Sequence, residues 1–191
     1  MWNDRASVEG IDLDALLDRI AARSAAPASG STAALVAAMA AALCTKIARF
    51  SDDDGAAAQA EALRRRLTAL AQEDAVAFEA ALRTLDEPRE DDPERRDWQL
   101  GRSLAAAAEV PLRIVEVCAD VADLGAELAL RCRPELQPDA SGATMLAEAA
   151  ARVCAHLVAV NLGATSTDAR VRRAEWFAAA AGEAVARSGA G

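Results

Sequence analysis

Asp74 is a carboxylate within an apolar stripe, and this makes it the first candidate for chemistry. It follows Leu70 by four residues and precedes Phe78 by four, which places all three side chains on one face of a helix. A carboxyl group held away from water has a raised pKa and acts as a general acid or base, or binds the N–H edge of a ring. A structural aspartate, either in a helix cap or paired with an arginine, is the alternative, because buried carboxylates are rare unless paired.

Asp139 and Lys46 are two further candidate catalytic residues. Asp139 follows Pro138 just ahead of an alanine-rich segment, where an aspartate serves either as a helix N-cap or as a catalyst. Lys46 is the one lysine of the chain and lies near the bulky stripe of the predicted helix 31–50. If it is buried beside Asp74, the two side chains share a proton and tune each other for acid–base work. Otherwise its aliphatic stem carries the ammonium group to water.

A polar turn leads into the same helix and offers a binding site at the helix start. Pro27 ends the preceding segment, and Ser29, Gly30 and Ser31 follow it closely. The first N–H groups of a helix lack intrahelical partners and carry a partial positive charge, so an anion or a polar ring edge binds there. A plain helix N-cap is the alternative for the serines. We take these three residues as candidate substrate-binding residues.

Asn161 is the fourth candidate substrate-binding residue. It falls on the predicted inner face of a helix, in line with Cys154 and Leu157, where its amide either orients a ligand or makes an interhelical hydrogen bond. The sequence contains no nucleophile–base–acid triad and no phosphate-binding loop. Its four cysteines form no CxxC pair and a single histidine accompanies them, so no metal site is predicted.

Helices must position these side chains, because apolar residues recur at helical spacing along most of the chain. The pattern predicts helices at residues 11–22, 31–50, 56–85, 93–132, 141–162 and 171–185, with a kink at Pro111. No strand pattern occurs. The predicted fold class is therefore all-α: one domain over 1–191 that forms a bundle of five to six helices in orthogonal or up-down packing. Residues 1–10 and 188–191 are predicted to be loose ends.

The helix at 31–50 is predicted to lie at the centre of the bundle. Its many alanines let neighbouring backbones approach closely. Its bulky stripe consists of Leu35, Met39, Leu43, Ile47 and Phe50. Because alanine-rich helices leave flat apolar faces that a small monomer covers poorly, we expect a homodimer.

Composition argues against several classes of function. Hydrophobic residues make up 53% of the 191 residues and aromatic ones 3%, so the apolar content is mainly alanine and leucine. The net charge of -9 argues against binding to nucleic acid or to an anionic membrane surface. We find no stretch long and apolar enough to span a bilayer and no basic secretory start. With cysteines interpreted as buried thiols in a reducing compartment, the sequence predicts a cytoplasmic protein.

Five segments, in order and at suitable separations, carry a resemblance to a known family. They are Pro27-Ala28-Ser29-Gly30-Ser31-Thr32-Ala33-Ala34, Glu73-Asp74-Ala75-Val76-Ala77-Phe78, Ala107-Ala108-Glu109-Val110-Pro111-Leu112, Pro138-Asp139-Ala140 and Val160-Asn161-Leu162. Together they resemble the cyclodeaminase/cyclohydrolase family over residues 13–173. This family comprises the C-terminal domain of formiminotransferase-cyclodeaminase and bacterial relatives such as methenyltetrahydrofolate cyclohydrolase.

The resemblance implies a homodimeric helical bundle that binds a tetrahydrofolate derivative as its substrate and holds no tightly bound cofactor. The reaction is either ring closure of the 5-formimino form with loss of ammonia or hydrolysis of the 5,10-methenyl form. Arg49, Arg102 and Arg113 are possible cations for the glutamate tail, and the sequence does not choose among them. Gly30 alone remains where the family has consecutive glycines. The alternative is therefore a diverged homologue with a non-folate substrate or a non-catalytic ligand-binding or dimerisation role.

Overall fold

The protein is all-helical in the computed structural model, which describes residues 12–86, 93–163 and 168–189. Within these ranges it consists of six α-helices and one short 3₁₀-helix, with no strand. The elements are α1 (Leu13–Ala21), α2 (Ser29–Phe50), α3 (Asp54–Asp86), α4 (Pro93–Arg131), η1 (Pro134–Leu136), α5 (Gln137–Leu162) and α6 (Ala169–Arg187). The predicted all-α bundle is confirmed.

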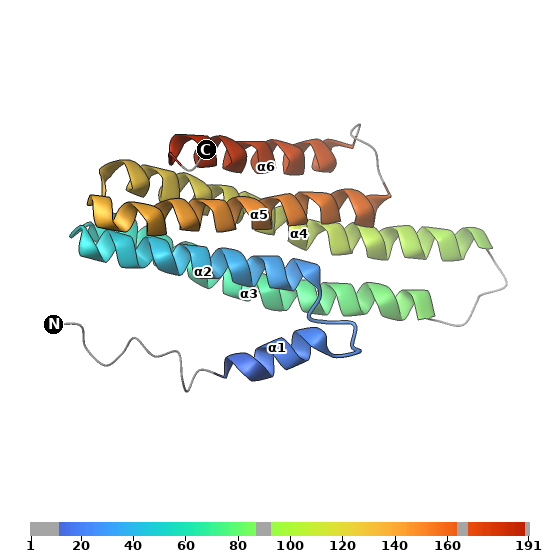
Figure 1. Cartoon of the computed structure of the whole chain (residues 1–191). Coiled ribbons are helices and arrows are strands. Elements are labelled where there is room, and N and C mark those ends of the chain that lie inside the picture. The colour runs from blue at the N-terminus through green and yellow to red at the C-terminus, as the bar shows by residue number, and fades with distance from the viewer. Residues whose placement is uncertain (1–11, 87–92, 164–167, 190–191) are drawn as a thin grey trace.

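Four long helices form the body of the bundle in up-down order (Figure 1). The helices α2 and α3 form one antiparallel hairpin, and α4 and α5 form a second. The hairpins pack together because α2 contacts α5 and α3 contacts α4. Helix α6 lies against α4 and α5, and the short α1 lies near the start of α2. This arrangement brings the start of α2, the middle of α3 and the second half of α5 into one region.

Alanine forms the buried face of α2, and this explains how closely its neighbours pack. The fully buried alanines of this helix are Ala34, Ala37, Ala40, Ala41 and Ala48. A methyl side chain lets an adjacent backbone approach, so these positions fill the core without bulk. The bulky stripe predicted for this helix lies only partly on its core face: Ile47 is buried and Leu35 and Leu43 pack against the core, but Met39 and Phe50 are 55% and 51% exposed.

Two helices begin earlier than the sequence indicated, which moves predicted loop residues into helical turns. Helix α2 begins at Ser29, so Gly30 lies in its first turn. Helix α5 begins at Gln137, so Asp139 lies inside the first turn and does not cap the helix. Proline is tolerated at the start of a helix, where its missing N–H has no intrahelical partner to lose. Pro138 therefore does not delay the start of α5.

The expectation that no stretch is able to span a bilayer is wrong on length and composition. Helix α2 and the segment 134–162 have apolar windows with mean hydropathies of 1.6 and 1.4. In the fold, 61% of the first window and 44% of the second are buried inside the protein. A core helix of a soluble protein passes the same test, so the two helices are only a weak indication of membrane spans.

The chain is ordered beyond the point where the sequence predicted a loose C-terminal end. Ser188 is 2% exposed, and its carbonyl oxygen accepts a hydrogen bond of 3.0 Å from the Ser141 hydroxyl. Gln137 donates to the same oxygen at 3.3 Å. These contacts tie the end of α6 to the start of α5, so residue 188 is not part of a loose end. The predicted loose start at 1–10 and residues 190–191 lie outside the described residues.

The cysteines behave mostly as the sequence predicted. Cys44, Cys118 and Cys154 are buried, whereas Cys132 is half-buried, and none of the four forms a disulfide. Burial raises the pKa of Cys44 and of Cys118 to about 12. Both thiols therefore stay protonated near neutral pH and serve as small apolar side chains.

Candidate active site

Asp74 is buried and is bound by the start of a neighbouring helix. Its residue is 6% exposed, and α3 directs the side chain toward the first turn of α2. The Ser31 hydroxyl donates to Asp74 Oδ2 at 2.9 Å, and the Ser31 backbone N–H also donates to this carboxyl group. Neither bond comes from an arginine, so the arginine-paired form of the structural alternative is wrong, whereas its capping form agrees with these contacts to the first turn of α2.

Gly30 is the residue that lets this carboxylate approach the helix. A Cβ atom added at Gly30 would lie 2.4 Å from Asp74 Oδ1 and 2.6 Å from Oδ2, far inside van der Waals contact. Any larger side chain at position 30 must displace the Asp74 carboxyl group. The single glycine retained in the predicted binding turn is therefore explained by the close approach of Asp74.

Burial dominates the electrostatics of Asp74. Loss of solvent raises the pKa of its carboxyl group above the ordinary value of 3.8, and the two bonds from Ser31 lower it in part. The N-cap residue of α2, Ala28, provides no side-chain cap. Asp74 thus supplies from α3 the acceptor and negative charge that a helix start favours. The Asp74 carboxyl group therefore holds a proton more readily than an exposed aspartate does.

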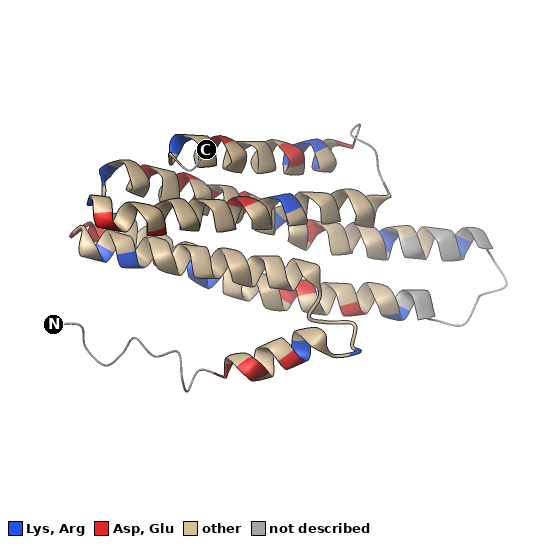
Figure 2. Ribbon diagram, viewed as in Figure 1, with Lys and Arg blue, Asp and Glu red and all other residues tan. Residues whose placement is uncertain are grey.

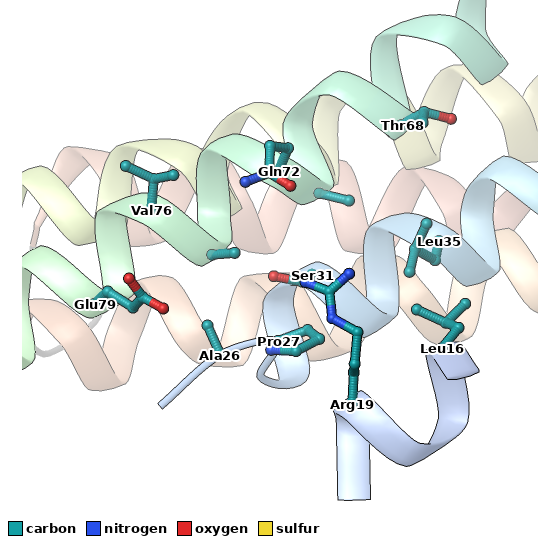
Figure 3. A pocket seen from close by; sticks show the side chains of 12 residues that line it. Leu16, Arg19, Ala26, Pro27, Ser31, Leu35, Thr68, Gln72, Val76 and Glu79 are labelled. Carbon is teal, nitrogen blue, oxygen red and sulfur yellow. The ribbon is translucent and has the colours of Figure 1, made fainter. Parts of the chain in front are cut away.

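A cavity of about 270 Å³ opens beside this pair, between α1, the start of α2 and α3 (Figure 3). Ser31 forms part of its wall, so the Asp74 carboxylate lies directly behind a residue that faces the cavity. The polar lining residues are Arg19, Ser31, Thr68, Gln72 and Glu79; the apolar ones are Leu16, Ala26, Pro27, Leu35, Ala71, Ala75 and Val76. This mixture suits a flat ring that carries polar edges.

The other side of the α2 start faces α5 and forms a separate, mainly apolar groove of about 440 Å³. Ser29 lines this groove together with Thr32, Val36 and Val153. Ser29 and Ser31 therefore point to different sides of the same helix turn. Of the three predicted substrate-binding residues in this turn, only Ser31 lines the cavity beside Asp74.

Lys46 and Asp139 form an ion pair of their own at the opposite end of α2. Lys46 Nζ lies 2.6 Å from Asp139 Oδ2, and the two side chains are 50% and 42% exposed. Lys46 follows Gly30 by sixteen residues, which is about 24 Å along a helix axis. Within a single chain, Lys46 is therefore neither buried nor close enough to Asp74 to share a proton with it, so this hypothesis is wrong. The geometry brings Lys46 and Asp139 together, but not to Asp74.

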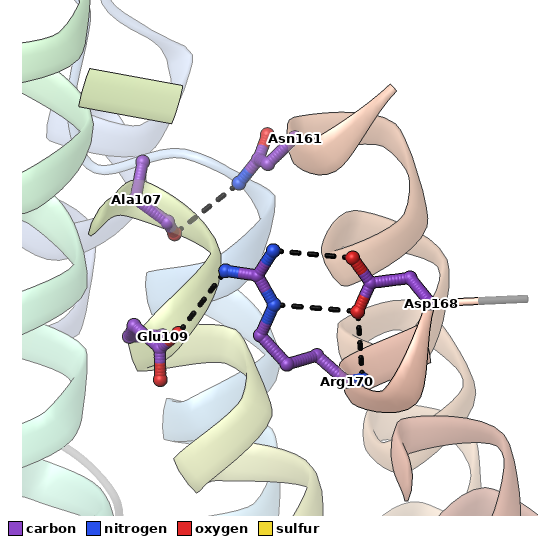
Figure 4. A network of polar contacts seen from close by, with 5 residues as sticks. All are labelled: Ala107, Glu109, Asn161, Asp168 and Arg170. Carbon is purple, nitrogen blue, oxygen red and sulfur yellow. Dashed lines mark hydrogen bonds and ion pairs between the residues drawn. The ribbon is translucent and has the colours of Figure 1, made fainter. Parts of the chain in front are cut away.

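Asn161 makes the interhelical hydrogen bond that was the simpler alternative for it. Its Nδ2 donates to the backbone oxygen of Ala107 at 3.2 Å (Figure 4). Ala107 precedes Pro111 by four residues, and proline has no N–H to give to that oxygen. Asn161 thus supplies the donor that Pro111 lacks. Its neighbour Arg170 binds Asp168 at 3.1 Å and Glu109 at 3.5 Å, which joins α6 to α4.

Arg19 and Glu79 line the cavity and were not predicted as site residues. Arg19 lies three residues after Leu16, on the edge of the apolar stripe of α1, and this spacing is the signal that was available. Glu79 lies five residues after Asp74 on α3. The three arginines predicted for an acidic tail, Arg49, Arg102 and Arg113, are absent from the cavity lining.

The fold and the site define a class of protein: an all-α bundle that holds a buried carboxylate against a helix start, beside a cavity of mixed polarity. Over residues 12–178 the chain matches the model of the formiminotransferase-cyclodeaminase family. The protein belongs to this family, which confirms the resemblance found in the sequence.

Two relatives are informative. The chain is 33% identical over 105 residues to the methenyltetrahydrofolate cyclohydrolase of Methylorubrum extorquens, a match that covers 54% of this chain and half the length of that protein. It also resembles the crystal structure of formiminotetrahydrofolate cyclodeaminase from Thermotoga maritima, with a TM-score of 0.81 and 25% identity. That likeness covers 95% of this chain and 96% of the other. Both relatives are named for a reaction of a tetrahydrofolate derivative.

Proposed function

We propose that this protein is a folate one-carbon enzyme that acts at the N5/N10 bridge of tetrahydrofolate. Its family and the names of its two relatives support this class of substrate. The relatives are named for different reactions, so two activities are candidates: 5,10-methenyltetrahydrofolate cyclohydrolase and 5-formiminotetrahydrofolate cyclodeaminase. Both reactions need proton transfer at nitrogen and oxygen atoms and no redox step.

The observation that carries the proposal is the Ser31–Asp74 pair at the wall of the cavity. The 5,10-methenyl bridge is a cationic amidine, and a carboxylate close to it stabilises that charge in a site shielded from water. The Asp74 carboxyl group has a raised pKa, so it is able to accept a proton and return it within one turnover. Ser31 stands between this group and the cavity and relays the proton.

In the hydrolysis, the oxygen of a water molecule attacks the bridge carbon. One water proton passes to Ser31 Oγ while the hydroxyl proton of Ser31 passes to Asp74 Oδ2. The same path then returns a proton to the ring nitrogen as its bond to the carbon breaks, which leaves a formyl group on the other nitrogen and releases one proton. In the deamination, N10 attacks the formimino carbon, and the proton that N10 loses passes through Ser31 and Asp74 to the formimino nitrogen. A second proton, taken up from solvent, lets this nitrogen leave as ammonia as its bond to the carbon breaks, which leaves the cationic methenyl bridge.

The test is an assay of the purified protein with each substrate. Loss of the methenyl absorbance identifies the cyclohydrolase, whereas its appearance together with ammonia from the formimino form identifies the cyclodeaminase. We expect Asp74→Asn to lower the productive turnover at least about 100-fold and Ser31→Ala to lower it about 10-fold or more. Asp120→Asn is the control, because desolvation also raises the pKa of this carboxyl on α4, but Asp120 is exposed and makes no contact with Ser31.

Absence of both reactions in the wild type would contradict the proposal and favour the alternative, a homologue with a non-folate substrate or a non-catalytic role. Unchanged turnover in Asp74→Asn would instead contradict the mechanism. Lys46 and Asp139 are not part of the proposed relay, and their catalytic roles stay predictions from the sequence.

We further propose that two copies of the chain associate through the exposed face that α2 and α5 share. This α2–α5 face contains the apolar side chains Met39, Phe50, Met145, Leu146, Val153 and Val160, each 40% exposed or more. Within each chain α2 and α5 run antiparallel along this face, because Lys46 of α2 pairs with Asp139 of α5 at one end and Ser29 lies near His156 at the other. Most of α2 carries no charge (Figure 2). Large apolar side chains exposed on two neighbouring helices are typical of a subunit interface.

We propose that the protein acts in the cytoplasm on its small-molecule substrate, with no nucleic-acid or membrane partner and no tightly bound cofactor. The four free cysteines suit a reducing compartment. The net charge of -9 opposes binding to nucleic acid and to anionic lipids. The proposed chemistry uses water and the side chains of the chain itself.

A further inference from the structure

Arg19 is a cavity-lining cation whose charge no described residue neutralises. It lines the cavity from α1, and its guanidinium group extends past Pro27 toward Ser31 (Figure 3). Within residues 12–86, 93–163 and 168–189, it makes no ion pair and no side-chain hydrogen bond. An unpaired guanidinium group at the edge of a cavity is a ready binding group for a carboxylate or a phosphate.

Glu79, the acidic residue of the cavity lining, does not neutralise the positive charge of Arg19. Glu79 lies on α3, and its Oε2 is 3.1 Å from Nη2 of Arg83 on the same helix. Asp74 is bound by Ser31 behind the cavity wall. The two carboxylates near the cavity are thus engaged with groups other than Arg19. The pattern suits a ligand with a polar ring at the Ser31 wall and an anionic arm at α1.

We propose that Arg19 binds the glutamate carboxylate of the folate substrate, which makes it a specificity-determining residue. This inference rests on the proposed function, and it replaces Arg49, Arg102 and Arg113 as the cation for the acidic tail. The glutamate arm is the anionic part of a tetrahydrofolate, and it lies at the opposite end of the molecule from the pterin ring. A ring seated against Ser31 therefore directs this arm outward, past Pro27 and along α1, where Arg19 lies.

The test compares substrates with and without the glutamate. We expect Arg19→Gln to raise KM for 5,10-methenyltetrahydrofolate about 10- to 100-fold, the scale of one charge-assisted carboxylate contact. The kcat should stay within about twofold, because Arg19 does not touch the reacting bridge. With the amide of 5,10-methenyltetrahydropteroate, which carries neither the glutamate nor a free carboxylate, wild type and variant should share one KM. Arg19→Lys should recover part of the lost affinity, and Arg23→Gln, outside the cavity lining, should behave as wild type.

An unchanged KM in Arg19→Gln would overturn the inference. An equal rise in KM for both substrates would also overturn it, because it would mean that the variant only displaces α1. A protein that turns over neither substrate contradicts the proposed function, and titration with p-aminobenzoylglutamate then tests Arg19 by itself. Binding that Arg19→Gln weakens, with p-aminobenzamide unaffected, supports the carboxylate subsite; no binding, or binding equal in the variant, overturns it.

Discussion

At the level of single residues, the site depends on three side chains or backbone positions that fix one another by direct contact. Asp74 provides the acceptor for the first turn of α2, Ser31 donates to it, and Gly30 leaves room for the carboxyl group. The same contacts that stabilise the start of α2 hold a desolvated carboxyl group next to a cavity. Structural capping and the proposed proton transfer therefore use one and the same side chain.

Gly30→Ala tests this arrangement. The added methyl would lie 2.4 Å from Asp74 Oδ1, so we expect the free energy of unfolding to fall by about 1–3 kcal/mol, as for other overpacked sites. Turnover should fall as far as in Asp74→Asn, since the carboxyl group is displaced. Gly182→Ala is the control: nothing lies within 4 Å of its Cβ position, and it should stabilise α6 by about 0.5–1 kcal/mol. Denaturant unfolding measures both, and equal behaviour of the two variants would contradict the prediction.

The raised pKa of Asp74 predicts a pH dependence of stability. The folded state binds the proton more tightly than the unfolded state, in which the pKa is near 3.8. Stability from this group is therefore fully present below pH 3.8 and is lost as the pH rises through the higher folded value. Asp74→Asn lacks this titration, so its free energy of unfolding relative to wild type should increase from pH 3.5 to pH 7. Urea unfolding across this range measures it, and a pH-independent difference would refute the expectation.

At the level of the helices, side chains provide hydrogen-bond partners for backbone groups that have none within their own helix. Pro111 sits inside α4 and deprives the Ala107 oxygen of its donor, and Asn161 at the end of α5 replaces that donor. Asp168 accepts from the Arg170 backbone N–H at 2.8 Å and caps α6. The ends of α5 and α6 are thus fixed to α4 by contacts that follow from a proline and a helix start.

A double-mutant cycle tests the role of Asn161. Asn161→Ala should lower the free energy of unfolding by about 1–3 kcal/mol, because it leaves the Ala107 oxygen without a partner. In a Pro111→Ala background the helix supplies its own N–H, so the same substitution should cost much less. Chemical unfolding of the four proteins measures the coupling. Equal costs in the two backgrounds would show that Asn161 acts in another way, such as on a ligand.

In the whole molecule, α2 and α5 direct apolar side chains both toward the core and toward solvent. Their alanine faces form the core, and their bulky side chains form the exposed α2–α5 face. The two helices are the same ones whose composition suits a membrane span, although most of the α2 window is buried in the fold. A second copy on the α2–α5 face accounts for the bulky exposed residues without a bilayer.

Sedimentation of the purified protein should show a species of twice the 19.8 kDa chain mass at micromolar concentration. Met39→Glu should shift this species to the monomer, because it buries a charge in the proposed interface. Leu130→Glu, at a 72% exposed site on α4 outside the α2–α5 face, should leave the dimer intact. A wild-type protein that sediments only as a monomer would contradict the prediction, and flotation of the monomer with lipid vesicles would favour a membrane surface as the occupant.

The helical class, the order of the helices and the face on which Asp74 lies could all be predicted from the amino-acid pattern. These are local properties, because helical periodicity over a few turns assigns a side chain to the inside or outside. The ordered segments were also enough to indicate the family. Burial of Asp74 followed from the same pattern, since the side chain falls between Leu70 and Phe78, but its contact with the Gly30–Ser31 turn did not.

Which side chains meet depends on how the helices pack against one another. Periodicity gives the face of a residue but not the height at which two helices pair, so Lys46 was placed with Asp74 when its partner is Asp139. The partner of Asn161 depends in the same way on how α5 lies against α4. Arg19 entered the cavity because α1 lies beside the start of α2, a contact between elements that no local pattern encodes. The register between helices is set by packing of the whole core, and the site is built from that register.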